Sequence, residues 1–429
     1  MKNRNLFFGL FVSILLISNG CNKENGNNAE PEIPEKVYIT SLINPSMYEL
    51  QEFYKEGYNV VNGNIKLDST LGLINLLALS NLRIIKGFLS INKNLELLSL
   101  EGLDNLEKIG GYLEITSNYN LEFIDGLSKL ESIGGYLSIS SNHHLNKIKG
   151  INSLVEIGSY YKLYGNMNLK SVIGLNNLRI VNEYMQIDMN GRLIIIEAFD
   201  NVLTIDGFLS ISANGGLAIN ETLQIDGFNK LETMGHLIFT DNFNIYATPE
   251  FNNLKNVNGT FTISNNKSLE VIQGLSQLQK VNGLFEILGN KSLKEVKGFN
   301  SLEVVNDRFI LASNDSLFTI EGFGLLEFVY GNFQMSNNYN NELIDGLQSL
   351  KNIGGDCYLY NNYQIERLDM LQNLLTVNGD LKIVGNIELS DLCGIINLLT
   401  TNGVGGVVEI IDNEYNPSVE DIIAGDCSL

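Results

Sequence analysis

The stretch 110–118, Gly-Gly-Tyr-Leu-Glu-Ile-Thr-Ser-Asn, returns at 134–142 as Gly-Gly-Tyr-Leu-Ser-Ile-Ser-Ser-Asn. In each copy Leu and Ile alternate with other residues, which is the pattern of a short strand with one buried face. One such strand cannot bury its apolar face alone, whereas identical turns stacked about 4.8 Å apart bury it against one another. The repeat therefore predicts a parallel solenoid.

A single asparagine marks the same point of every repeat. Its spacing is constant except for two wider gaps, one before Asn242 and one before Asn413. The column comprises Asn94, Asn118, Asn142, Asn166, Asn190, Asn214, Asn242, Asn266, Asn290, Asn314, Asn338, Asn362, Asn386 and Asn413. An inward amide can satisfy backbone groups at a corner, so we interpret the column as structural, with a polar ligand site as the minor alternative.

These 14 positions predict an all-β fold, namely a right-handed parallel β-helix or leucine-rich solenoid of about 14 rungs with a 24-residue repeat and short helical caps at both ends. The cap signals are Asn44-Pro45-Ser46 and Asn416-Pro417-Ser418, each followed by an apolar segment that stops at a glycine. We expect the asparagines to be the N-caps. The irregular segment 215–251, which contains Pro249, is expected to form a loop or bend between two halves.

The N-terminus has the pattern of an export and anchoring signal. Two basic residues precede a short apolar run, Leu6–Ile17, and then Ser18-Asn19-Gly20-Cys21. We interpret 1–20 as a lipoprotein signal peptide, 21–36 as the lipidated Cys21 (carrying palmitate or a similar acyl chain) with a polar tether, and 37–429 as one continuous solenoid. An ordinary signal peptide with an incidental cysteine is the alternative. The expected location is the outer membrane, lipid-anchored and surface-exposed.

Three further cysteines lie in the repeat region. Cys357 falls on an inward position and is expected to be a buried thiol. Cys393 and Cys427, near the C-terminus, could pair outside the cytoplasm, and the sequence leaves open whether they do.

The string Ile-x-Gly-Leu-x-x-Leu-x-x-Ile-x-Gly-x-Leu-x-Ile-x-x-Asn, found at 124–142, resembles the receptor L domain, the leucine-rich β-helical module of growth-factor and insulin receptor ectodomains. Similar repeats occur in surface lipoproteins of Bacteroidota-type bacteria. The resemblance covers about residues 37–427 and implies a binding module, but ligand contacts in those receptors lie on variable outward positions, so none is carried over. This chain departs from the receptors in running about 14 rungs without a cysteine-rich module.

Catalytic and metal-binding patterns are missing from the sequence. The net charge of −21 opposes nucleic acid and anionic membrane surfaces. The three histidines, His143, His144 and His236, do not follow metal-ligand spacing, and no nucleophile elbow or phosphate loop is present. We therefore predict no enzyme activity, no cofactor and no metal.

One outward column is aromatic over six successive repeats. Because Leu113 and Ile115 point inward, the residue before them points outward. The column comprises Phe88, Tyr112, Tyr136, Tyr160, Tyr184 and Phe208. Cross-strand stacking that stiffens the sheet is one interpretation. The other is a ligand-binding strip for a glycan or peptide, with Glu114, Lys162 and Gln186 beside it.

The sequence therefore predicts non-catalytic recognition or adhesion at the cell surface, with a protein or glycan ligand and with the membrane contacted only through the lipid. A passive envelope spacer is the first alternative and a polysaccharide-active β-helix enzyme is the second.

Overall fold

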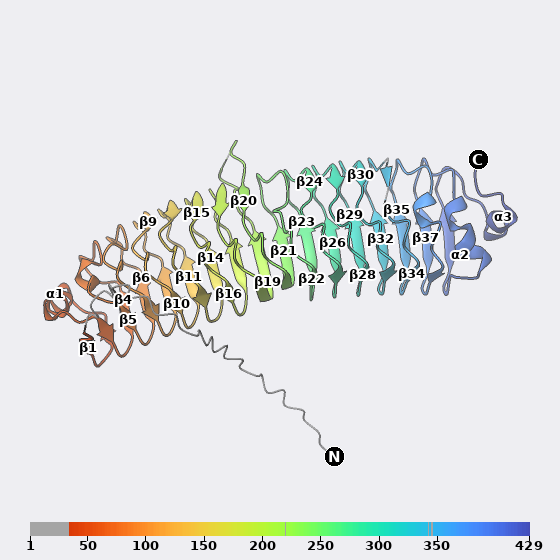
Figure 1. The fold of residues 1–429 in the computed structure, drawn as a ribbon. Helices are drawn as coiled ribbons and strands as arrows, with labels where there is room; N and C mark the ends of the chain where they lie inside the picture. The colour runs from red at the N-terminus through yellow and green to blue at the C-terminus, as the bar shows by residue number, and fades with distance from the viewer. Residues whose placement is uncertain (1–33, 219, 342, 345) are drawn as a thin grey trace, which may run out of the picture. The chain divides into compact units, whose positions relative to one another are not determined.

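The computed structural model describes residues 34–218, 220–341, 343–344 and 346–429. The solenoid comprises Lys36–Leu429 (Figure 1). The expected signal peptide and the lipidation site at Cys21 lie outside the described residues.

The solenoid is built on one parallel sheet of 29 strands, which we call the front sheet. Its 15 longer strands, one for each turn, are β4 (Ile65–Asp68), β6 (Leu89–Asn92), β8 (Leu113–Thr116), β11 (Leu137–Ser140), β14 (Tyr161–Tyr164), β17 (Met185–Asp188), β19 (Thr204–Ser212), β21 (Thr233–Thr240), β23 (Phe261–Ser264), β26 (Phe285–Leu288), β29 (Phe309–Ala312), β32 (Phe333–Ser336), β35 (Cys357–Tyr360), β37 (Leu381–Val384) and β38 (Val408–Ile411).

Shorter strands complete the front sheet and form two smaller sheets behind it. The remaining front strands are β1 (Val37–Tyr38), β2 (Leu42–Ile43), β3 (Val60–Val61), β5 (Ile84–Ile85), β7 (Lys108–Ile109), β10 (Ser132–Ile133), β13 (Glu156–Ile157), β16 (Ile180–Val181), β22 (Asn256–Val257), β25 (Lys280–Val281), β28 (Val304–Val305), β31 (Phe328–Val329), β34 (Asn352–Ile353) and β36 (Thr376–Val377). One back sheet holds β9 (Phe123–Ile124), β12 (Lys147–Ile148), β15 (Ser171–Ile173), β18 (Ile195–Glu197) and β20 (Gln224–Asp226), and the other holds β24 (Val271–Ile272), β27 (Glu295–Val296), β30 (Thr319–Ile320) and β33 (Leu343–Ile344).

The repeat period sets the register of the front sheet. Leu113 pairs with Leu137, which pairs with Tyr161, and the alternate residues Ile115, Ile139 and Leu163 form the next inward column. All six side chains are fully buried. The parallel solenoid expected from the repeat is therefore confirmed, with about 15 turns, because β4 begins a turn in which Thr70 takes the place of the ladder asparagine.

The asparagine column is a hydrogen-bonded ladder inside the solenoid. Asn118 is typical: its Nδ2 donates to the Ile91 carbonyl at 2.7 Å, and its backbone N–H donates to Oδ1 of Asn142 at 2.9 Å. All 14 asparagines are buried. The residue before each one is left-handed, and it is a glycine only at Gly165, Gly289 and Gly385. The ladder begins at the Thr70 N–H, which donates to Asn94, and ends at Asn413, whose N–H and Nδ2 donate to Asn416.

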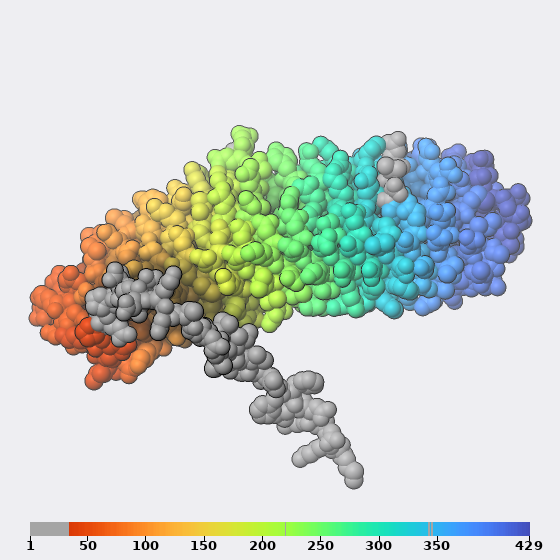
Figure 2. Space-filling model, in the orientation of Figure 1, coloured from red at the N-terminus to blue at the C-terminus, as the bar shows by residue number. Residues whose placement is uncertain are grey.

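The segment 215–251 interrupts the back sheets but not the front sheet. Ile195 pairs with Gln224, so the loop after Asn214 is longer than the loop of a regular turn. The front pairing continues from β19 to β21, with a register shift between Ile205 and Phe208. The back sheet, in contrast, ends at β20, and the next one starts at β24. The turn beside β20 projects beyond its neighbours (Figures 1 and 2).

Helices lie at both ends, but their N-caps differ from our expectation. α1 (Met47–Glu56) is capped by Ser46, and α3 (Val419–Ala424) is capped by Ser418, each through a capping box with an acidic N3 residue. The prediction that Asn44 and Asn416 are the N-caps was wrong, because a serine with an acid three residues later satisfies two helix donors reciprocally. A short helix, α2 (Ile396–Thr400), and the 3-10 turns η1 (Leu77–Leu79), η2 (Asp369–Leu371) and η3 (Cys393–Ile395) complete the described helices.

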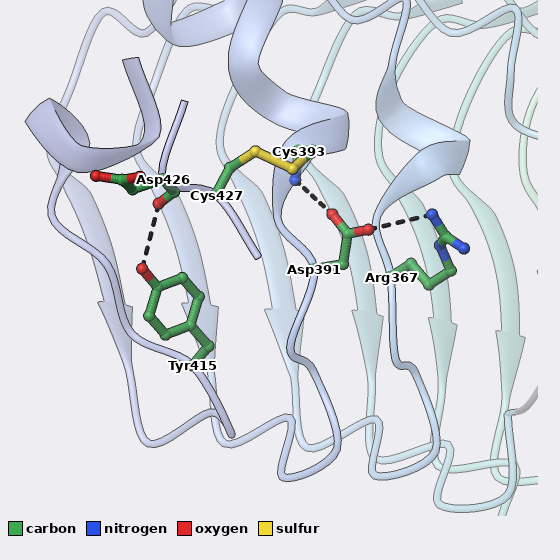
Figure 3. The surroundings of a disulfide bond; sticks show 6 residues. All are labelled: Arg367, Asp391, Cys393, Tyr415, Asp426 and Cys427. Atoms are coloured by element: carbon green, nitrogen blue, oxygen red, sulfur yellow. Dashed lines mark hydrogen bonds and ion pairs between the residues drawn. A yellow bond between two sulfur atoms is a disulfide. The ribbon is translucent and has the colours of Figure 1, made fainter. Parts of the chain in front are cut away.

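The C-terminal tail is fastened to the last turns by a disulfide between Cys393 and Cys427, whose Cα atoms are 5.0 Å apart (Figure 3). Asp391 joins this region to the preceding turn, because it accepts from the Cys393 N–H at 2.9 Å and from Arg367 at 3.1 Å. The tail then pairs antiparallel with the chain through a bridge between Asp391 and Ser428. Cys357 is a free, buried thiol, as expected from its inward position.

Candidate functional site

The six aromatic residues of the outward column form one continuous stack at the start of the front strands. The five successive ring centroids are 4.5, 4.5, 4.7, 4.6 and 4.5 Å apart from Phe88 to Phe208. The interplanar angles do not exceed 11°. Each ring face therefore lies against the next ring, and each side chain is half-buried. The stack presents ring edges and hydroxyl groups to solvent rather than open ring faces.

The hydroxyl groups of this aromatic stack stay protonated well into the alkaline range. Loss of contact with water raises the pKa of Tyr112, Tyr136, Tyr160 and Tyr184, because burial disfavours the phenolate. The negative charge of Glu114 adds to this effect on the pKa of Tyr112 and Tyr136. At neutral pH the stack is therefore a row of uncharged donors and acceptors.

In several other turns the same column holds a polar side chain that accepts a backbone N–H. Asn332 Oδ1 accepts the Asp356 N–H at 3.0 Å, Asp356 Oδ1 accepts the Asp380 N–H at 2.9 Å, and Asp380 Oδ1 accepts the Val407 N–H at 2.9 Å. Asn64 and the Nδ1 atom of His236 accept the equivalent N–H groups of Phe88 and Thr260. A polar side chain at this position is thus a structural solution that the fold already uses, so the fold does not require an aromatic stack.

The neighbouring outward columns are polar and tightly connected. Glu114 accepts from Ser90 at 3.3 Å and from Asn92 at 2.9 Å, and Gln186 donates to Asp188 at 2.6 Å. The ammonium of Lys162 lies 4.9 Å from the ring centroid of Tyr164. The side chains expected beside the aromatic stack are therefore there, but each also contacts a neighbouring side chain.

A groove that the sequence interpretation missed runs along the other end of the same strands. Its volume is about 520 Å³, and it crosses four turns. Leu71, Leu95 and Tyr119 line it and are 87%, 63% and 49% exposed. His143 continues the column, with its ring 5.3 Å from that of Tyr119.

A signal for this groove was present in the repeat. The residue after the ladder asparagine is apolar or aromatic in several early turns, at Leu95, Tyr119 and Met167, although an exposed turn position is usually polar. Extended chain connects Tyr112 to Ser117, so the groove lies roughly 17 Å from the aromatic stack. The two features border one polar strip on the first turns of the solenoid.

Metal-binding and membrane-spanning features are not found in the part of the chain that the structure describes. There, no three His, Cys, Asp or Glu residues gather in a way that could hold a metal ion. No described helix is long and apolar enough to cross a membrane. The His144 ring lies tilted beside that of Tyr119, with ring centroids 5.1 Å apart, and His236 accepts a hydrogen bond from the Thr260 backbone N–H.

The solved structures with distant similarity to this chain include the following two. One is a leucine-rich repeat protein from Bacteroides ovatus, with 11% identity over 76% of this chain and 78% of that chain and a TM-score of 0.38. The other is the pneumococcal vaccine antigen PcpA, with 13% identity over 76% of this chain and 79% of that chain and a TM-score of 0.20. No family model matches this sequence, and no curated protein matches it.

Proposed function

We propose that this protein is a non-catalytic recognition lipoprotein of the cell surface, similar to receptor L-domain modules, anchored in the outer membrane through Cys21. Its ligand, a protein or a glycan, lies along the first turns of the front sheet. The aromatic stack and the groove lined by Leu71, Leu95 and Tyr119 are the contact features, and the polar columns between them supply hydrogen bonds.

One observation carries this proposal: in three later turns the same outward column holds Asn or Asp, whose side-chain oxygen accepts a backbone N–H. In six consecutive turns this column holds an aromatic ring instead. The ring edges and the four tyrosine hydroxyl groups of this row offer a partner both apolar contact and hydrogen bonds, which favours recognition. The competing function, a passive spacer, is supported by the mutual stacking of the rings, which also stiffens a sheet.

Replacing Tyr136 and Tyr160 by asparagine separates the two functions. Three ring pairs are lost, at about 0.2–1 kcal/mol each. Two backbone donors, the N–H groups at positions 160 and 184, can then bond to the new amide oxygens, as the Asp356 N–H does with Asn332, at about 0.5–1.5 kcal/mol each. The double asparagine variant should therefore keep close to wild-type stability, whereas the double alanine variant loses the stacking without compensation.

The experiment is a glycan array and a protein array probed with the detergent-solubilised full chain. Ligands that the wild-type chain binds should be lost by both double variants and kept by Tyr161→Phe, which changes a fully buried ring one residue from the stack. A Tyr136→Phe, Tyr160→Phe variant keeps the stack and tests the hydroxyl groups alone. If every ligand is bound equally by the double asparagine variant, the aromatic stack is structural and the proposal is wrong.

The anchor is tested separately. Cys21→Ala should move the protein from the membrane fraction to the soluble fraction, because the acyl chains contribute about 0.8 kcal/mol per buried methylene to membrane affinity. Unchanged membrane retention would contradict this part of the proposal.

A further inference from the structure

At the C-terminal edge of the front sheet, strand β38 pairs with β37 on one side, and no described strand pairs with its other side. In a parallel ladder alternate residues direct their backbone groups to the same neighbour. The carbonyls of Val407 and Ile411 accept from Leu381 and Gly385 in the preceding turn. The N–H and C=O groups of Val408 and Ile410 therefore point away from the solenoid, and no hydrogen bond joins them to any described residue.

The apolar core is also open at this edge. Val408 and Ile410 continue the inward columns of Leu381 and Ile383. Leu381 and Ile383 are fully buried, whereas Val408 and Ile410 remain partly exposed. Val407 beside them is 63% exposed and Ile411 is 43% exposed. An apolar edge strand of this kind is a template for a further strand.

At the C-terminal end, the chain itself covers the back of the last turns and terminates the asparagine ladder. The back is covered by the antiparallel bridge between Asp391 and Ser428 and by the Cys393–Cys427 disulfide. The asparagine ladder is terminated by Asn416. At the opposite end the edge strand β2 has only two residues and is followed by Pro45 and α1, and its inward Leu42 is buried. Short strands and prolines protect sheet edges, so β38 is the exception.

The negative charge of the C-terminal turns indicates which kind of partner fits this edge. Residues 366–429 hold 11 acidic and two basic residues, a net charge of −9 out of −21 for the whole chain. Glu409 lies on β38 itself, and Asp412 and Glu414 follow it, both exposed. Edge-to-edge pairing of two copies would bring two such ends together, which is unfavourable. Head-to-tail stacking would place β38 against the end that carries the α1 cap.

We propose that β38 binds a basic, extended segment of another protein, which adds as a strand to the front sheet. Its backbone bonds to Val408 and Ile410, its apolar residues cover these two side chains, and a basic residue between them faces Glu409. The preceding strand shows this pattern within the chain, because β37 reads Leu-Lys-Ile-Val and its Lys382 lies 3.5 Å from Glu409. This binding mode is strand addition, in which main-chain bonds supply affinity and alternate side chains supply specificity.

The test uses two labelled peptides with blocked ends, Gly-Leu-Lys-Ile-Lys-Gly and Gly-Leu-Glu-Ile-Glu-Gly, titrated with the full chain and followed by fluorescence anisotropy. The lysine peptide should bind more tightly than the glutamate peptide, and its affinity should fall with added salt. Ile410→Pro removes an outward N–H and no internal bond, and it should weaken binding about tenfold. Glu409→Lys should weaken it without altering the backbone.

The matched control is Ile43→Pro, which alters the outward N–H of the opposite edge strand and should leave binding unchanged. The proposal would be overturned if the two peptides bound equally tightly. It would also be overturned if Ile410→Pro and Glu409→Lys both bound the lysine peptide as tightly as the wild-type chain does. Sedimentation velocity of the full chain tests whether a second copy of the chain binds β38 instead. Self-association that Ile410→Pro abolishes would show that a second copy covers β38, which also overturns it.

Discussion

Replacing Asn290 by alanine gives the sharpest test of the asparagine ladder. Asn290 is fully buried in the middle of the solenoid. Its Oδ1 accepts the Asn266 N–H at 3.0 Å, and its Nδ2 donates to the Ile263 carbonyl at 2.9 Å. The substitution leaves the Asn266 N–H without an acceptor and removes one of the hydrogen bonds to the Ile263 carbonyl, since Ile263 also pairs with β26 in the front sheet. At about 1–3 kcal/mol for the unpaired N–H and about 0.5–1.5 kcal/mol for the lost bond, the expected loss in the free energy of unfolding is about 1.5–4.5 kcal/mol.

Two measurements check this prediction. Urea unfolding gives the loss of stability, read against Asn282→Ala, because Asn282 is an exposed asparagine whose side chain bonds to those of Asn258 and Asn306. Hydrogen exchange followed by mass spectrometry gives its location, because the Asn266 amide loses its acceptor and should exchange faster along with the adjoining turns. A local effect is expected, since each turn of a solenoid contacts only its neighbours.

The reasoning is refuted if Asn290→Ala unfolds within about 0.5 kcal/mol of Asn282→Ala, the range typical of surface substitutions. It is also refuted if the Asn266 amide keeps its protection. Either result would mean that water or a rearranged turn replaces the amide and that the column is not a structural requirement.

Three further predictions follow from other features. Tyr161→Phe should stabilise the protein, by about 1–3 kcal/mol in thermal or urea unfolding, because the Tyr161 hydroxyl is buried without a hydrogen-bond partner among the described residues; a lower stability would contradict this. The double variant Cys393→Ser, Cys427→Ser should lower the free energy of unfolding by about 4 kcal/mol, from the chain-entropy relation for a sequence separation of 34. Hydrogen exchange should become faster only in the last turns, and unchanged exchange there would refute this. The raised pKa of the stacked tyrosines means that the folded state binds these protons more tightly than the unfolded state, so their contribution to stability is complete below pH 10 and is lost as the pH rises above it. An ultraviolet titration should show seven late-ionising tyrosines, because the pKa values of Tyr161, Tyr358 and Tyr360 are raised as well. Two of the seven should disappear in the double asparagine variant.

The sequence by itself determined the repeat, its register and the direction of its side chains. A period of two along each strand and a constant period between turns leave only one arrangement that buries Leu113 and Ile115 with their equivalents, and it places the aromatic column outside and the asparagine column inside. The sequence also predicted where the two cap helices end, because Gly57 and Gly425 adopt positive φ angles that other residues rarely take.

Only the tertiary structure decided what these columns present to a partner. The tilt of each ring depends on the ring in the next turn, so the sequence could not show that the stack exposes edges rather than faces. The groove needs four turns side by side, and its apolar residues lie a full repeat apart in the chain. The choice of Ser46 over Asn44 as the helix N-cap depended on Glu49 reaching back, while Asn44 bonded to the next turn.

The open edge at β38 has the same origin. A repeat sequence looks alike at its last turn and at its central turns, and Val408 and Ile410 read as core residues like any others. Their exposure arises because the chain turns back along the other side of the solenoid, and within the described residues no further turn is stacked on them. Local pattern fixes which way a side chain points, but what covers it depends on contacts between residues far apart in the chain.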